Sequence, residues 1–254
     1  MIRVLTLLVL LLPAPGWAGC RQALALGLDV SGSVDAREYR LQLDGLAAAL
    51  LSPAVQSRLL AMPGHPIRLA VYEWSEPGFQ RLILPWRQIG TTADLEAVAA
   101  TLRATRRAAA PPGTAVGPAM RHGATLLAQQ PDCWKRTLDL SGDGKHNMGP
   151  HPRAVKAALE GTDLTVNALV IGADSMTSTD LRQTQIGELS AYYGAWVILG
   201  PGAFVEVALG YDDYQAAMER KLRRELEGLV LSALPARTAT QLHAPVLPGP
   251  VLPQ

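Results

Sequence analysis

Runs of apolar residues divide the chain into buried strands and amphipathic helices. The stretches at 23–30 and 164–171 are almost continuously apolar, as in strands that are covered on both faces. A Ser-Glu-Pro-Gly turn signal at 75–78 separates two further strand patterns and predicts an antiparallel hairpin. We therefore expect six strands, at residues 23–30, 67–74, 79–86, 136–140, 164–171 and 195–199.

Helical patterns fill most of the intervals between these strands. Asp35 begins the first helix, and Thr92 is the expected N-terminal cap of the next. Further helices are expected at 115–130, 152–160, 180–193 and 212–231. Strands that alternate with helices predict an α/β fold: a doubly wound, mostly parallel six-stranded sheet with helices on both faces and one antiparallel edge strand. In such sheets, ligands bind at the carboxyl ends of the strands.

The composition fits one folded domain and excludes several other classes of protein. Of the 254 residues, 48% are hydrophobic, which is inconsistent with a largely disordered chain. The 23 basic and 22 acidic side chains leave a formal charge of +1, so nucleic acid is not an expected partner. Two cysteines are too few for a disulfide scaffold.

The two ends of the chain differ from the part between them. Arg3 precedes a short apolar stretch, and small residues precede a cleavage point after Ala18, which is typical of a signal peptide. This stretch is too short to span a bilayer, and no later run is long enough. The expected organisation is a signal peptide at 1–18, a folded domain at 19–234 and a proline-rich tail at 235–254. We expect a periplasmic or extracellular protein, with a lipid on Cys20 as the alternative.

Oxygen-bearing side chains gather where the predicted strands end. The candidates are Asp29, Ser31, Ser33, Thr114 and Asp143. Asp29, Ser31 and Ser33 lie at the carboxyl end of the strand at 23–30, Asp143 follows the strand at 136–140, and Thr114 lies in a loop that could bring a third hydroxyl over the sheet. Carboxylate and hydroxyl oxygens are hard ligands, so the expected cation is Mg²⁺, with Mn²⁺ or Ca²⁺ as alternatives.

These residues carry a resemblance to a known family. Asp-Val-Ser-Gly-Ser at 29–33, Gly-Thr-Ala-Val-Gly at 113–117 and Asp-Gly at 143–144 resemble the metal-ion-dependent adhesion site of von Willebrand factor A (VWA) domains. The chain is also similar to an uncharacterised group of secreted bacterial proteins with such a domain. The resemblance implies that all five candidate side chains hold the cation, directly or through water. It also implies that a partner protein supplies an acidic residue to the open position.

One position departs from the pattern of the resembled family. Most members have threonine before the second aspartate, whereas Gly142 stands there and Ser141 comes one place earlier. Asp139 is a rival carboxylate, but it lies inside the predicted strand. We expect Asp143 to belong to the site, because a loop at the end of a strand reaches the ligand.

The resemblance also bears on the two cysteines. Cys20 lies nine residues before Asp29, and Cys133 lies ten residues before Asp143. In the VWA sheet the first and fourth strands are adjacent, which would bring the two cysteines together at the opposite end of these strands. A Cys20–Cys133 disulfide is therefore expected, with a lipidated Cys20 and a free Cys133 as the alternative.

Two other functions compete with metal-dependent binding of a partner. A metal-dependent hydrolase would need a general base, and His146 is the candidate near the second aspartate. No complete Ser/His/Asp set is present, so we expect that the protein is not an enzyme. A structural envelope protein with the same fold but no use for its metal is the third hypothesis.

Overall fold

The computed structural model describes residues 19–172 and 179–231. The expected signal peptide at 1–18 and the expected tail at 235–254 lie outside these residues. The strands are β1 (Cys20–Asp29), β2 (Ile67–Trp74), β3 (Gln80–Ile89), β4 (Cys133–Gly142), β5 (Leu164–Ile171) and β6 (Val205–Ala208). The helices are α1 (Ala36–Leu51), α2 (Pro53–Leu59), α3 (Thr92–Ala104), α4 (Val116–Ala128), α5 (Pro152–Leu159), α6 (Thr179–Trp196), the short 3₁₀ helix η1 (Tyr211–Asp213) and α7 (Tyr214–Leu231).

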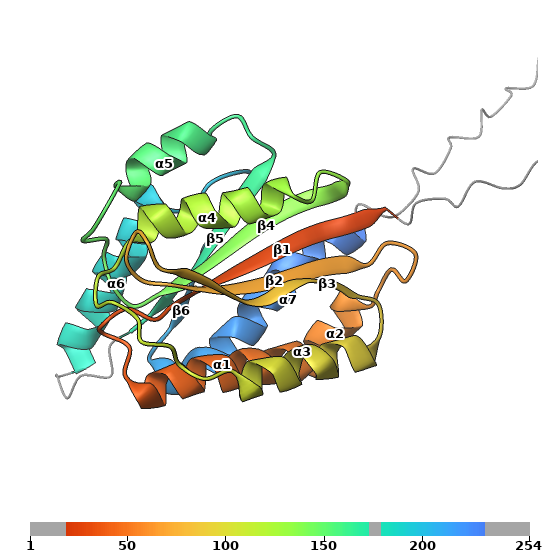
Figure 1. Cartoon of the computed structure of the whole chain (residues 1–254), viewed down its shortest axis with the longest axis horizontal. Helices are drawn as coiled ribbons and strands as arrows, with labels where there is room; N and C mark the ends of the chain where they lie inside the picture. The colour runs from red at the N-terminus through yellow and green to blue at the C-terminus, as the bar shows by residue number, and fades with distance from the viewer. Residues whose placement is uncertain (1–18, 173–178, 232–254) are drawn as a thin grey trace, which may run out of the picture.

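The strands form one sheet with the order β3-β2-β1-β4-β5-β6 (Figure 1). Neighbouring strands are parallel, except that the edge strand β3 runs antiparallel to β2. This is the expected VWA-like α/β fold. The central strand β1 is buried along its whole length because helices cover both of its faces.

Helices cover the two faces of the sheet as separate layers. In Figure 1, α4, α5 and α6 lie on one side of the sheet, and α1, α2, α3 and α7 lie on the other. Alternate residues of β1 divide between the two cores: Leu24, Leu26 and Leu28 pack toward α1 and α7, whereas Ala23 and Ala25 pack toward α4. The small alanines allow α4 to approach β1 closely.

The last strand differs from the sequence prediction. The apolar run at 195–199 was expected to be the sixth strand, but α6 continues through Trp196. Leu199 forms only an isolated antiparallel bridge with Val166, and the sixth strand is β6. Val197 is fully buried, so the run is apolar because it packs against the core directly after the helix.

Two helix details also differ from the prediction. The expected cap of α3 was Thr92, but Thr91 is the cap: its hydroxyl accepts from the Asp94 amide, and Asp94 accepts from the Thr91 amide. Helix α2 was not predicted. It begins after Ser52, with Pro53 in its first turn, and it is too short for a clear periodicity.

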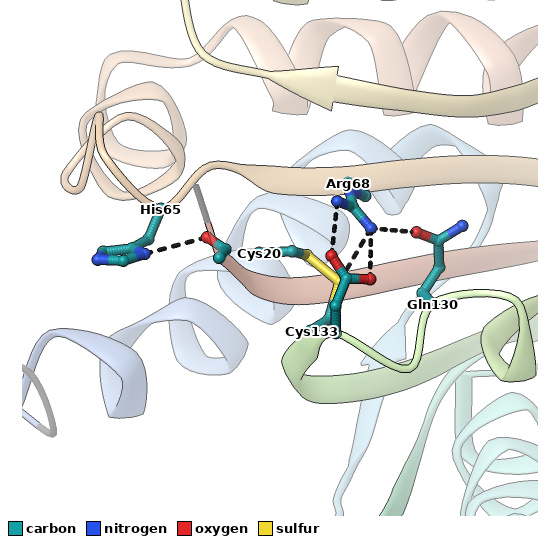
Figure 2. Close-up of a disulfide and its surroundings, with 7 residues drawn as sticks. Cys20, His65, Arg68, Gln130 and Cys133 are labelled. Carbon is teal, nitrogen blue, oxygen red and sulfur yellow. Dashed lines mark hydrogen bonds and ion pairs between the residues drawn. A yellow bond between two sulfur atoms is a disulfide. The ribbon is translucent and has the colours of Figure 1, made fainter. Parts of the chain in front are cut away.

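A disulfide joins β1 and β4 at the end of the sheet where both strands begin (Figure 2). Cys20 and Cys133 are partners in the strand register, so the expected pair is confirmed. On the neighbouring strand β2, Arg68 donates to Gln130 and forms an ion pair with Asp132 at 2.8 Å. Three adjacent strands are therefore tied together at this end.

Candidate functional site

The opposite end of the sheet carries the predicted oxygen cluster. Asp29 ends β1, and its Oδ1 accepts a 2.8 Å hydrogen bond from the Ser31 amide. The hydroxyls of Ser31 and Ser33 lie 3.2 Å apart. Ser33 in turn donates to Oδ1 of Asp143 at 2.6 Å, across 110 residues of sequence. The structure thus brings these four predicted residues into one chain of contacts.

Hydrogen bonds to its backbone groups fix the loop that follows β1. The Val30 amide donates to the carbonyl of Trp74 at 3.0 Å, and the Gln42 side chain donates to the carbonyl of Asp29 at 3.0 Å. The Arg107 guanidinium lies 3.4 Å from the carbonyls of Val30 and Ser31. Together these contacts hold the loop from both sides.

Thr114, the fifth predicted residue, is held over the sheet by the loop that contains Asp143. The Thr114 amide donates to Oδ1 of Asn147 at 2.8 Å, and the Asn147 amide donates back to the Thr114 carbonyl at 2.9 Å. A Cβ at Gly117, one turn later in α4, would overlap the carbonyl oxygen of Pro150. Glycine is therefore required for α4 to approach this loop, and the approach places Thr114 beside Gly144.

The side chains of the site range from fully buried to exposed. Asp29 and Ser31 are fully buried, Asp143 is partly buried, and Ser33 is exposed. A cavity of about 230 Å³ opens beside Asp143. It is lined by Asp143, Lys145, Ile171, Gly172, Gln185, Ile186, Glu188 and Leu189. A ligand approaching from solvent would therefore meet Ser33 and Asp143 before Asp29.

The two carboxylates are costly to ionise in the absence of a cation. Burial, and then the charge of Asp143, raise the pKa of Asp29 to about 8. Burial also raises the pKa of Asp143, against the opposing effect of the hydroxyls of Ser33 and Tyr211 that donate to it. A bound divalent cation would reverse this preference, because it favours the ionised form of both groups.

The side chains present fit a hard divalent cation. Oδ2 of Asp29 is buried and has no hydrogen-bond partner among the described residues. No group of three or more His, Cys, Asp or Glu side chains suited to a metal occurs in the described part of the chain. The candidate set does not need one, because three of its five donors are hydroxyls. Such a set suits Mg²⁺, Mn²⁺ or Ca²⁺ better than a soft metal.

The rival carboxylate Asp139 lies within β4, on the face of the sheet that α7 covers. It forms a buried ion pair with Lys221 of α7. Ser141 faces the same side, where its hydroxyl lies 3.3 Å from that of Tyr214. Neither of these side chains joins the cluster at the strand ends.

Some residues around the site were not predicted from the sequence. The Tyr211 hydroxyl donates to Oδ2 of Asp143 at 3.2 Å, and the Tyr193 hydroxyl donates to the carbonyl of Gly144 at 3.3 Å. Burial and the charges of the two carboxylates raise the pKa of both tyrosines well above the ordinary value, so each stays a neutral donor. The other residues around the site that the sequence did not predict are Asn147, Gln42 and Arg107. Only Asn147 has a sequence signal, since it lies in the loop after Asp143.

His146 and His151 are engaged in local contacts. His146 Nε2 lies 3.1 Å from the carbonyl of Gly149, and burial lowers its pKa. His151 caps α5, where its Nδ1 accepts from the amide of Arg153 at 3.1 Å. These contacts give both rings a role in shaping the loop.

Solved structures with the same fold include proteins from animals and bacteria. Proximal thread matrix protein 1 from the mussel byssus, in a structure described as having a zinc-occupied MIDAS motif, is 18% identical, with a TM-score of 0.55 over 82% of this chain and 48% of that one. A von Willebrand factor type A protein from Catenulispora acidiphila is 15% identical, with a TM-score of 0.53 over 83% of this chain and 43% of that one. The pilus adhesin SpaC from Lactobacillus rhamnosus GG is 13% identical, with a TM-score of 0.55 over 83% of this chain and 31% of that one. The chain thus spans half or less of the length of these proteins.

Sequence comparison gives the family of the chain. No curated protein matches the sequence. None of the described helices is long and apolar enough to cross a membrane. A family profile described as a protein of unknown function, DUF1194, matches residues 19–230. The chain therefore belongs to the DUF1194 family, and its fold is that of a VWA domain.

Proposed function

We propose that this protein binds a partner protein through a divalent cation that Asp29, Ser31, Ser33, Thr114 and Asp143 hold at the end of the sheet. One observation carries the proposal: contacts of Ser31 and Ser33 link the carboxylates of Asp29 and Asp143, and one buried oxygen of Asp29 has no hydrogen-bond partner in the described part of the chain. Unpaired buried oxygens are costly unless a ligand satisfies them. A cation bound there would satisfy Asp29 Oδ2 and both charges.

Each residue of the site has a distinct part in this function. Asp29 and Ser31 form the buried floor, and the amide of Ser31 fixes the direction of the Asp29 carboxylate. Exposed Ser33 and partly buried Asp143 form the rim that a partner meets first. When bound, the cation supplies positive charge and an open position for an acidic side chain of the partner. A surface carboxylate is therefore the expected recognition element.

We also propose that the protein acts outside the cytoplasm, in the periplasm or the extracellular space. The expected signal peptide at 1–18 supports export. The Cys20–Cys133 disulfide supports it independently, because such bonds persist in oxidising compartments. Mg²⁺ is the proposed cation, since hydroxyls and carboxylates supply all the donors.

Asp29→Asn tests the function with little change in side-chain volume. We expect wild type to bind Mg²⁺ or Mn²⁺ by calorimetry and to capture a partner from envelope extract with the metal but not with chelator. Asp29→Asn should lose both activities. The matched control is Asp163→Asn, which replaces a fully exposed aspartate just before β5, where that strand begins at the other end of the sheet.

The outcomes separate the three functional hypotheses. Wild type that binds no cation would refute the metal-dependent function. Capture that persists in both chelator and Asp29→Asn would favour the structural envelope protein. Metal-dependent hydrolysis that is lost in His146→Ala would favour the enzyme.

A further inference from the structure

Gly142, the last residue of β4, has no room for a side chain. A Cβ there would overlap the hydroxyl oxygen of Tyr193. The next nearest atoms are Asp29 Oδ2 at 3.2 Å and Trp74 Cζ2 at 3.4 Å. Among the described residues, the Tyr193 hydroxyl is therefore the atom that a Cβ would overlap, whereas Asp29 Oδ2 would be a tight contact without overlap.

Tyr193 reaches this point from α6, 51 positions later in the chain. Its side chain is fully buried and belongs to the core cluster that also contains Trp74. Among the described residues its hydroxyl has one hydrogen bond, to the carbonyl of Gly144, which is long at 3.3 Å. A buried hydroxyl is costly without a good hydrogen bond, so this long contact leaves room for a further role of the hydroxyl.

The same small space borders on the unpaired oxygen of the site. Asp29 Oδ2 lies 3.2 Å from the position that a Cβ of Gly142 would take, and it has no partner among the described residues. A buried donor and a buried acceptor thus line one space beside Gly142. A carboxylate that ligates a metal is commonly oriented by such a donor.

We propose that the Tyr193 hydroxyl is a positioning group of the metal site: it exchanges its long hydrogen bond to the Gly144 carbonyl for one to Asp29, and so orients that carboxylate toward the cation from the space left open by Gly142. This inference rests on the proposed metal site and adds a residue to it. Gly142 and Tyr193 act as a pair: the glycine admits the hydroxyl, and the tyrosine supplies the donor that a hydroxyl side chain at position 142 would otherwise provide. This pairing gives a physical reason why the chain can have glycine where most members of the resembled family have threonine.

The first test removes only the hydroxyl. Tyr193→Phe keeps the buried ring, so the melting temperature in EDTA should stay close to that of wild type. Calorimetric affinity for Mg²⁺ and Mn²⁺ should fall by roughly tenfold, the lower end of the effect of losing a group that orients a ligand. The matched control is the neighbouring Tyr192→Phe, whose hydroxyl lies 3.4 Å from His151 Nε2 and which should bind like wild type.

The second test moves the hydroxyl from α6 to β4. Gly142→Ser alone should unfold at a lower temperature, because its Cβ overlaps the Tyr193 hydroxyl. The double variant Gly142→Ser/Tyr193→Phe relieves this overlap and returns a hydroxyl to the same space. It should recover most of the stability lost in Gly142→Ser and bind the cation more tightly than Tyr193→Phe.

The outcomes distinguish this inference from the proposed function. Wild type without measurable cation binding overturns both. Wild type that binds, together with a Tyr193→Phe variant of equal affinity, overturns the positioning role alone. A double variant that is as unstable as Gly142→Ser overturns the pairing of Gly142 with Tyr193.

Discussion

At the scale of single residues, Asp29 links protonation to metal binding. The folded protein without a cation holds the pKa of Asp29 at about 8 through burial and the charge of Asp143, against an ordinary value of 3.8. Between these two pKa values, Asp29 holds a proton in the folded state and releases it in the unfolded state. Stability from this proton is complete below about pH 4 and is lost as the pH rises through about 8.

This sign gives a prediction for the protein in EDTA. Between pH 5 and pH 8, the free energy of unfolding should fall by up to about 1.4 kcal/mol per pH unit because of Asp29. Asp29→Asn cannot titrate, so its slope, measured by urea denaturation, should be shallower than that of wild type. Equal slopes would show that Asp29 is already ionised in the metal-free fold. Burial raises the pKa of Asp139 to about 7, but this contribution is common to both proteins.

At the scale of elements, α7 carries charge into the core. Lys221 is fully buried and forms an ion pair with Asp139 of β4. Its Nζ also lies 3.7 Å from Oε2 of Glu225, one turn later in the helix. Asn167 of β5 donates to Glu225 at 3.0 Å and accepts from the amide of Phe204 at 3.1 Å. This network fixes how α7 sits on β4 and β5.

Removal of the buried charge of Lys221 should therefore destabilise the protein strongly. Lys221→Met leaves Asp139 and Glu225 in the core without a positive partner, and we expect a loss of about 3–5 kcal/mol in the free energy of unfolding. Lys145→Met is the matched control, because Lys145 and Glu188 form an exposed pair and should contribute less than about 1 kcal/mol. Similar losses in the two variants, measured by urea denaturation, would show that the buried network does not depend on Lys221.

At the scale of the whole molecule, the sheet separates a stabilising end from a binding end. The disulfide joins the beginnings of β1 and β4, whereas Asp29 and Asp143 lie at or just after the ends of the same strands. Each strand is 10 residues long, so the disulfide and the site lie on opposite edges of the sheet. The disulfide should therefore act on stability without acting on the site.

The double variant Cys20→Ser/Cys133→Ser tests this separation. The bond closes a loop with a sequence separation of 113, and its loss should reduce the free energy of unfolding by about 2–5 kcal/mol. Calorimetric affinity for the cation should stay within about twofold of wild type at a temperature where both proteins are folded. A parallel fall in affinity would mean that the disulfide also sets the geometry of the site.

The strand-end chemistry was predictable because it is local. Asp29, Ser31 and Ser33 leave one buried strand together, and parallel strands bring their ends to the same edge of a sheet. The sixth strand was not predictable in the same way. The run at 195–199 and β6 are both short and partly apolar, and only their packing shows that β6 pairs with β5.

The sequence by itself determined the α/β fold, the five candidate oxygen donors and, through the family resemblance, the cysteine pair. These depend on the order of elements and on strand ends, which the periodicity of a chain records. Only the tertiary structure decided that Tyr193 fills the space above Gly142, that Asn147 holds Thr114 and that Lys221 neutralises Asp139. Each of these contacts joins side chains from separate elements. Their geometry arises from close packing in three dimensions, which no spacing along the chain encodes.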